Sequence, residues 1–250
     1  MPLQAIAPHR LYRQIAAQLR ALIAHGEFDP GQRLPAERDL ATQLGVSRPT
    51  VREALIALEV EGVIEVRTGS GIYVCLPKPV PSTQTKAKHQ TKMAELGNAD
   101  WGPLEVMSAR LLVEAEVAAL AAAQASRSQL QAMATALQQM KQAAARSQAP
   151  SVGDQAFHLA IAQACGNGVL ADTVQHYWSA RDGALFKRLG DYFENPTSWQ
   201  HAIEEHSRIY QAMREHDPSA ARRAMQHHLR QAHKRFSASW RNAPLSPQPT

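Results

Sequence analysis

The chain has 250 residues, of which 44% are hydrophobic, and its 27 Lys and Arg outnumber its 22 Asp and Glu. This length accommodates two ordinary domains with packed cores. The two cysteines lie far apart in no CxxC pair, which excludes a disulfide framework and a thiolate zinc finger. The N-terminus lacks the apolar run of a signal peptide and no stretch approaches about 18 consecutive apolar residues. We therefore expect a cytoplasmic protein that does not bind a membrane.

Residues 1–75 predict three helices followed by a β-hairpin, the pattern of a winged helix-turn-helix domain. Apolar residues recur at helical spacing, and glycines fall at the predicted helix ends. Ser47 is a good N-cap for the third helix, which follows a three-residue turn, as a recognition helix does when it is presented to the major groove of DNA. The predicted helices cover 10–25, 35–44 and 47–61, and the predicted strands cover 63–67 and 71–74.

The charge of this first domain bears on how it can bind DNA. Up to Cys75 the sequence has eight arginines and eight acidic residues, so the domain carries no net charge. DNA affinity must then come from where a few arginines point. Arg48 and Arg52 lie four positions apart on one helix face, and Arg38 can join them from the preceding helix. A three-helix unit with a wing can also be a protein-interaction module, but these arginines favour DNA.

The remainder of the chain predicts a linker, a helical domain and a tail. Residues 76–100 are rich in proline and lysine, which is typical of a solvated spacer whose lysines can also reach phosphates. Residues 101–240 predict an all-helical domain, and 241–250 hold three prolines and predict a frayed end. The fold class is thus mainly α. The predicted helices of the second domain cover 104–125, 128–146, 152–165, 169–189 as one long helix, 199–216 and 220–240.

Four side chains of the helical domain have the spacing of a metal site. Asp154 and His158 are four positions apart and point from one helix face. His206 falls on the apolar stripe of its helix, and His228 falls on the stripe of the last helix, whereas His227 lies outside it. The set suits Zn²⁺, Ni²⁺ or Mn²⁺, of which we expect Zn²⁺. Any one of these histidines alone is more simply a hydrogen-bonded core histidine, whereas the four together favour a metal.

The N-terminal domain resembles the winged helix-turn-helix domain of the GntR family of bacterial transcription factors. This resemblance implies base or phosphate contacts from the recognition helix and the wing tip. Where some relatives carry a second hydroxyl residue, this chain has Pro49, so one hydrogen bond is missing. The matching segments are Leu34–Arg38, Val46–Arg48, Thr50–Leu55, Gly62 and Thr68–Gly71. The implied contacts are Arg38, Arg48, Thr50, Arg52, Thr68 and Gly69, to which we add the Ser47 hydroxyl.

The helical domain resembles the FCD ligand-binding domain of the FadR-type GntR regulators. The segment 154–158 with two later histidines matches the metal signature of these domains, and Gly166-Asn167 also fits. The resemblance implies a homodimer on a two-fold symmetric operator. Arg110 matches an arginine common in these domains and can pair bidentately with a ligand carboxylate, although a helix-packing arginine is an equal alternative. Arg181 and Tyr210 are weaker candidates for ligand binding.

Several passages resemble the regulators of hexuronate utilisation, namely 58–62 with 65–67, 109–114 and 217–225. We therefore expect a repressor, not an enzyme, whose operator affinity falls when a sugar acid such as glucuronate, galacturonate or fructuronate binds at the metal. Two alternatives stay open: a sensor in which the metal ion is itself the signal, and a metal-dependent enzyme fused to a DNA-binding domain. The enzyme alternative lacks a clear general base, because Glu205 lies about 100° round its helix from His206.

Overall fold

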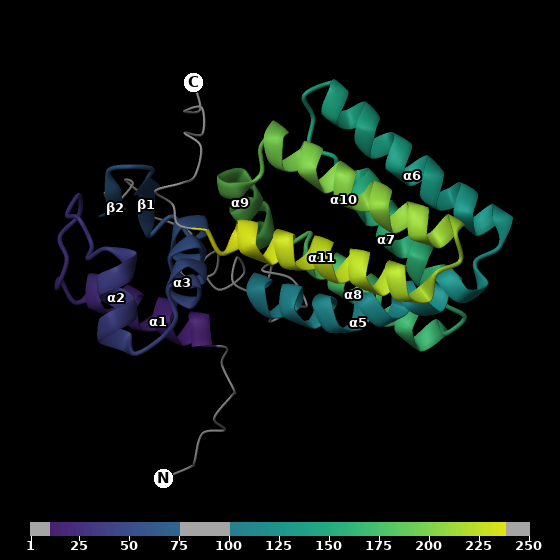
Figure 1. Ribbon diagram of the computed structural model, residues 1–250. Helices are drawn as coiled ribbons and strands as arrows, with labels where there is room; N and C mark the ends of the chain where they lie inside the picture. Colours follow the sequence, from purple (N-terminus) through teal and green to yellow (C-terminus); the bar gives the residue numbers. More distant parts are fainter. Residues whose placement is uncertain (1–10, 76–100, 239–250) are drawn as a thin grey trace, which may run out of the picture. The chain divides into compact units, whose positions relative to one another are not determined.

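The computed structural model describes residues 11–75 and 101–238, which form two compact units (Figure 1). The first unit contains the N-terminal helices and the hairpin, and the second contains most of the C-terminal helices. The predicted linker at 76–100 and the tail at 241–250 lie outside the described residues. Within those residues, no helix combines the length and apolarity needed to cross a membrane.

The first unit is the predicted winged helix-turn-helix, with helices α1 (Leu11–Ala24), α2 (Glu37–Leu44) and α3 (Arg48–Val60). Strands β1 (Ile64–Arg67) and β2 (Gly71–Val74) pair antiparallel. Helix α3 is the centre of this unit and packs against α1, α2 and β1. Its apolar residues, among them Val51 and Leu55, are fully buried. This burial fixes the start of α3, so that the groove residues described below have a rigid support.

Caps set both ends of the turn between α2 and α3. Gly45 adopts the left-handed conformation (φ +66°) that ends α2, where its N–H bonds back to the last helical turn. Ser47 caps α3 through its side chain, which accepts the N–H of Thr50 at 3.3 Å. The helix-turn-helix geometry predicted from the sequence is confirmed.

The second unit is all helical. Its helices include α5 (Pro103–Gln124), α6 (Arg127–Ala145), α7 (Ser151–Ala164), α8 (Gly168–Ala180), α10 (Pro196–Arg214) and α11 (Pro218–Phe236). Helix α6 packs against α7 and α10, α10 also packs against α11, and α7 packs against α8 (Figure 1). The packing turns one face of α7, α10 and α11 toward a common interior.

One predicted helix was wrong. The sequence pattern over 169–189 predicted a single long helix, but α8 ends at Ala180 and α9 (Ala184–Phe193) begins a new helix. The break coincides with the dipeptide Asp182-Gly183, and a glycine following an aspartate favours a turn over a continuing helix. The break also leaves Arg181 at the C-cap, where its side chain lies 3.3 Å from Asp154 of α7.

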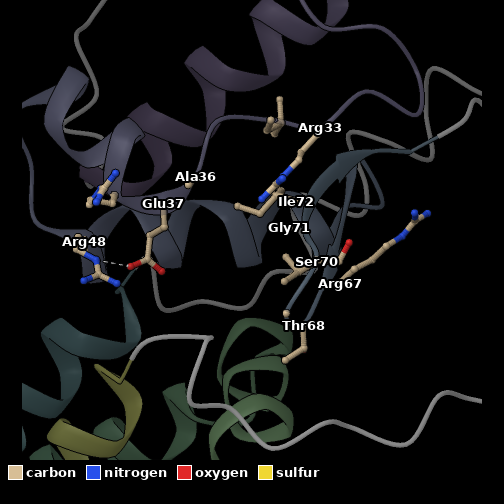
Figure 2. A pocket seen from close by; sticks show the side chains of 13 residues that line it. Arg33, Ala36, Glu37, Arg48, Arg67, Thr68, Ser70, Gly71 and Ile72 are labelled. Carbon is tan, nitrogen blue, oxygen red and sulfur yellow. Dashed lines mark hydrogen bonds and ion pairs between the residues drawn. The ribbon is translucent and has the colours of Figure 1, made fainter.

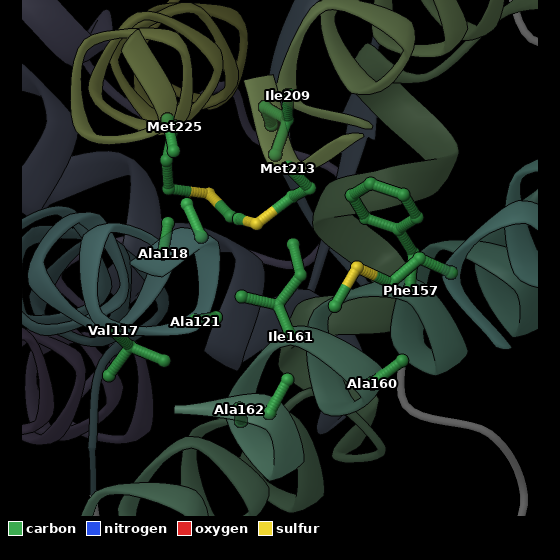
Figure 3. Close-up of a cluster of buried hydrophobic side chains, with 14 of the residues drawn as sticks. Val117, Ala118, Ala121, Phe157, Ala160, Ile161, Ala162, Ile209, Met213 and Met225 are labelled. Carbon is green, nitrogen blue, oxygen red and sulfur yellow. The ribbon is translucent and has the colours of Figure 1, made fainter. Parts of the chain in front are cut away.

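The core of the second unit is built from large side chains of α7, α10 and α11 against small ones of α5 (Figure 3). Phe157 and Ile161 of α7 meet Met213 of α10 and Met225 of α11, and all four are 1% exposed or less. The facing surface of α5 is mostly alanine, which lets its backbone approach closely. This core fixes the relative rotation of the helices that carry the candidate metal ligands.

Gly153 permits the close contact between α6 and α7. A Cβ at this position would lie 2.7 Å from the backbone nitrogen of Met140 and 2.8 Å from the backbone oxygen of Ala136. Backbone atoms of a helix cannot move aside as a flexible side chain can. The first turn of α7, which carries Asp154, is therefore held against α6 by the absence of a side chain at Gly153.

Candidate nucleic-acid interface and metal centre

A groove of about 450 Å³ opens in the first unit between the starts of α2 and α3 and the β-hairpin (Figure 2). Its charged lining residues are four arginines and one glutamate, so it concentrates positive charge in a domain that carries none overall. Such a groove matches the charge of a DNA backbone. The charged lining residues are Arg33, Arg38, Arg48, Arg67 and Glu37.

Arg48 and Arg38 reach solvent from this groove. The Arg48 side chain is 49% exposed at the start of α3, and its Nε donates a hydrogen bond to Glu37 at 3.0 Å. The Arg38 side chain is 79% exposed and pairs with Asp39, which is also exposed. The Arg38–Asp39 pair is exposed and contributes little to stability. Glu37 is buried, but the Arg48 side chain is half-exposed, so both guanidiniums can contact an external anion at the groove.

Arg52 occupies a different environment from Arg48, although they are four positions apart on α3. Its Nε and Nη2 donate to the two carboxylate oxygens of Glu37 at 2.9 and 2.8 Å, and the residue is 2% exposed. Burial lowers the pKa of Arg52, while Glu37 opposes that shift. The predicted DNA contact at Arg52 is thus placed inside the unit, where it neutralises Glu37, and it does not line the groove.

The remaining predicted contacts lie at the start of α3 and at the wing. The hydroxyls of Ser47 and Thr50 are 2.7 Å apart. Ser47 caps α3 and is also exposed to solvent. Thr68 and Gly69 line the groove at the tip of the hairpin, where Gly69 has a φ of +77°.

Arg33 is a groove residue that the sequence analysis missed. Its exposed side chain lies across Gly71 of the hairpin, where an added Cβ would be 2.5 Å from Arg33 Nε (Figure 2). Its backbone bridges to Tyr73, which brings the segment before α2 alongside the wing. No carboxylate of the described residues pairs with Arg33. The glycine directly after the wing turn, Gly71, was the available signal, but it could not show which side chain would lie over it.

Four predicted ligands meet in the second unit: Asp154 and His158 from α7, His206 from α10 and His228 from α11. Their ligand atoms all lie within 4.8 Å of one another, and the three histidines are buried. His206 Nε2 is 3.0 Å from Asp154 Oδ1 and 3.2 Å from His158 Nε2. Their helical periodicity had predicted these inward positions.

Each of the three imidazoles uses its Nδ1 for an outward hydrogen bond. A carboxylate or carbonyl oxygen has no proton to give, so Nδ1 must be the donor and Nε2 keeps its lone pair. Three such lone pairs therefore converge on one carboxylate oxygen, an arrangement that a cation would stabilise. The Nδ1 acceptors are Glu114 for His158, the Ala202 carbonyl for His206 at 2.7 Å, and Glu205 for His228 at 2.8 Å.

The protonation states fit a metal. Burial lowers the pKa of His158 and, together with the neighbouring histidines, holds the pKa of His228 well below its usual range. Burial would raise the pKa of Asp154, but the close contact with His206 and the charge of Arg181 hold it well below the usual value. Neutral imidazoles and an ionised carboxylate are the forms that bind metals. Asp154 Oδ1 is also buried and accepts no hydrogen bond from the described residues.

A cavity of about 50 Å³ adjoins this cluster and reaches Asp154 and His228. Arg181, Arg110 and Arg235 line it, as does Trp199, whose Nε1 is buried without a partner in the part of the chain that the structure describes. The cavity therefore combines hydrogen-bond donors with one side of the candidate metal centre.

The predicted ligand-binding residues differ in their availability. Arg181 Nη1 is 3.3 Å from Asp154, and its guanidinium stacks on Trp178 at 4.4 Å from the ring centroid. Arg110 is 1% exposed, and its Nε is 2.5 Å from Glu114, so its charge is already neutralised inside the protein. Tyr210 packs against the hydrophobic core and does not line this cavity.

Both units match the models of known protein families. Residues 11–74 match the model of the bacterial regulatory proteins of the gntR family, and residues 105–231 match the FCD domain. The chain belongs to the GntR family of transcriptional regulators. The Uxu operon transcriptional regulator of Escherichia coli K12 is 36% identical over 93% of this chain and 89% of its own length. The Exu regulon transcriptional regulator of the same strain is 36% identical over 89% of this chain and 83% of its own length.

Another similar protein widens the range of functions among the relatives of this GntR regulator. The putative L-lactate dehydrogenase operon regulatory protein of E. coli K12 is 33% identical over 92% of this chain and 89% of its own length. All three are named as regulators, and none is named as an enzyme. The gntR match spans the groove, and the FCD match spans all four candidate metal ligands.

Proposed function

We propose that this GntR regulator represses transcription by binding operator DNA through the arginine-lined groove, and that a sugar acid bound beside a divalent metal lowers its operator affinity. The observation that carries the proposal is the convergence of three imidazole lone pairs and the Asp154 carboxylate next to a cavity that contains arginine and indole donors. The resemblance to hexuronate regulators and the names of the Uxu and Exu relatives support the choice of effector.

The groove supports a division of roles among the predicted DNA contacts. Arg38 and Arg48 contact bases or phosphates, helped by the hydroxyls at the start of α3 and by the wing tip at 68–69. Arg33 adds a phosphate contact, because its guanidinium faces the same groove and pairs with no carboxylate of the residues that the structure describes. Arg52 acts indirectly, since it holds Glu37 and thereby sets where Arg48 points.

The effector site uses the donors of the small cavity. Arg181 is the proposed partner of the effector carboxylate, because it is less buried than Arg110 and lies beside the metal cluster. Trp199 Nε1 supplies a further donor for a hydroxyl or carboxylate oxygen. Arg110 and Tyr210 are weaker candidates, because Arg110 is held by Glu114 and Tyr210 packs against the hydrophobic core and does not line this cavity.

A homodimer follows from the same proposal. Two-fold symmetric operators require two winged units, whose half-sites lie about 34 Å or a multiple apart. Leu112 and Leu120 of α5 and Val169 of α8 are exposed at 73%, 44% and 75%, and such side chains suit an interface between two copies. The mass of the protein in solution, measured by light scattering, tests this directly.

The effector proposal is tested by the thermal stability of the full-length protein. Glucuronate, galacturonate and fructuronate are compared with glucuronamide, which keeps the hydroxyls but lacks the carboxylate. A ligand that binds only the folded state raises its stability in proportion to RT ln(1 + [L]/Kd). We expect a rise for at least one acid, none for the amide, and loss of the effect after chelation. Binding of a DNA duplex selected from a random pool should weaken with the same acid.

The small size of the cavity favours one alternative function, that of a sensor in which the metal ion is itself the signal. A water needs about 10–15 Å³, so the cavity of about 50 Å³ holds only a few waters, and a hexuronate requires side chains to move. Titration of DNA binding with Zn²⁺ alone separates the two. A full response to the ion with no effect of any acid supports the sensor and overturns the effector proposal.

A further inference from the structure

Two buried carboxylates stand directly behind the metal-facing histidines. Glu114 on α5 accepts the Nδ1 proton of His158, and Glu205 on α10 accepts that of His228 at 2.8 Å. Each carboxylate also pairs with one arginine: Arg110 lies 2.5 Å from Glu114, and Arg235 lies 3.1 Å from Glu205. The unit thus contains the same three-member arrangement twice, from arginine to glutamate to histidine, on different helices.

Burying a carboxylate is costly unless its oxygens are fully paired. Glu114 is 2% exposed and Glu205 is 6% exposed. Arg110 donates to both oxygens of Glu114, and His158 Nδ1 contacts one of them, so this buried carboxylate is fully paired. A carboxylate acceptor at Nδ1 fixes both the tautomer and the rotation of the ring. His206 obtains the same restraint from the Ala202 carbonyl without a buried charge.

We infer that Glu114 and Glu205 are positioning residues that hold His158 and His228 with Nε2 toward the metal and set the affinity of the site. The inference rests on the proposed metal centre and deepens it. Charged acceptors behind a metal-bound imidazole fix its orientation and raise its basicity, and loss of such a partner typically weakens metal binding 10–100-fold. The arginines hold the two carboxylates in place and are not themselves among the proposed metal ligands.

The test measures the metal affinity of the full-length protein. Zn²⁺ and Co²⁺ are titrated against a chromophoric chelator for the wild type, Glu114→Gln and Glu205→Gln. We expect each variant to bind about 10–100-fold more weakly. Glu116→Gln is the matched control, because Glu116 also lies on α5 and pairs with an arginine, Arg222, at 2.7 Å, but it touches no histidine. Its metal affinity should equal that of the wild type.

A second readout separates positioning from a general loss of structure. In the chelated wild type, nitrogen NMR should show His158 and His228 as Nδ1–H tautomers, and each glutamine variant should alter only the histidine it touches. Glu205→Gln is the variant expected to fold, because the partner of Glu205, Arg235, is 24% exposed and can be solvated when the carboxylate is removed, unlike Arg110. Unchanged affinity in both variants beside a metal-binding wild type overturns the inference. A wild type that binds no metal overturns the proposed metal centre instead.

Discussion

Arg52 provides the sharpest test of how the winged unit is built, because sequence and structure assign it different roles. The resemblance to GntR domains implied a DNA contact. The structure places its guanidinium inside the unit, paired bidentately with Glu37 at 2.8 and 2.9 Å and 2% exposed. We therefore expect Arg52→Ala to act first on stability, and on DNA binding only indirectly, through stability and the orientation of Arg48.

The magnitude follows from what the substitution leaves behind. Removing one partner of a buried ion pair typically costs about 3–5 kcal/mol, because the other charge remains buried. Arg48 also contacts Glu37, at 3.0 Å, but its side chain is 49% exposed, so it offsets only part of this loss. We expect about 3 kcal/mol. For a domain of this size, 1 kcal/mol corresponds to roughly 4–8 °C, so the unfolding transition of the winged unit should fall by about 12 °C or more.

The assay combines calorimetry of the full-length protein with operator binding by fluorescence anisotropy, each measured well below the new transition. Arg48→Ala is the matched control, since it removes the more exposed arginine on the same carboxylate and leaves the Arg52 pair intact. The reasoning is refuted if Arg52→Ala leaves the transition unchanged and still abolishes operator binding. That result would restore Arg52 as a direct DNA contact.

Four further predictions concern other parts of the molecule. Arg48→Ala should weaken specific operator binding by about 1–3 kcal/mol without lowering stability, and equal binding in the variant would remove it from base recognition. Arg33→Ala should weaken binding to specific and random duplexes alike and reduce the dependence of log K on log salt by about 1, with Arg127→Ala as the exposed control. His206→Ala should lose bound metal by elemental analysis, and full occupancy would contradict the ligand set. Gly153→Ala should destabilise the helical unit by about 1–3 kcal/mol in calorimetry, since α6 backbone blocks a Cβ there.

Helical periodicity predicted the cluster of one aspartate and three histidines because all four side chains project from the regular faces of helices. The i, i+4 spacing of Asp154 and His158 and the apolar stripes around His206 and His228 are local properties, and the helices preserve them. The hairpin and the caps of α2 and α3 were predicted for the same reason, since glycine and N-cap preferences act over a few residues.

The residues that the sequence did not reveal depend on contacts between elements. Glu114 looks like any acidic residue of an alanine-rich helix, and only the packing of α5 beside α7 brings it to His158. Arg33 lies in a segment without regular structure, so no periodicity could show that it crosses Gly71. Arg48 and Arg52 share a helix face, yet Arg48 lies at the rim of the groove and Arg52 lies inside the unit. The difference arises because α2 places the Glu37 carboxylate where Arg52 can pair with both of its oxygens.

The near-zero charge of the winged unit explains why these placements matter for regulation. Non-specific affinity for DNA grows with the number of phosphates neutralised, and a unit with eight arginines and eight acids has little surplus charge to contribute. In the proposed function, its affinity therefore depends on the arginines of one groove meeting the duplex in register. A dimer doubles these contacts only when both grooves face successive half-sites. In the proposed mechanism, an effector that changes the spacing of the two winged units of a dimer removes one set of contacts, and the winged units carry no surplus charge to compensate for that loss.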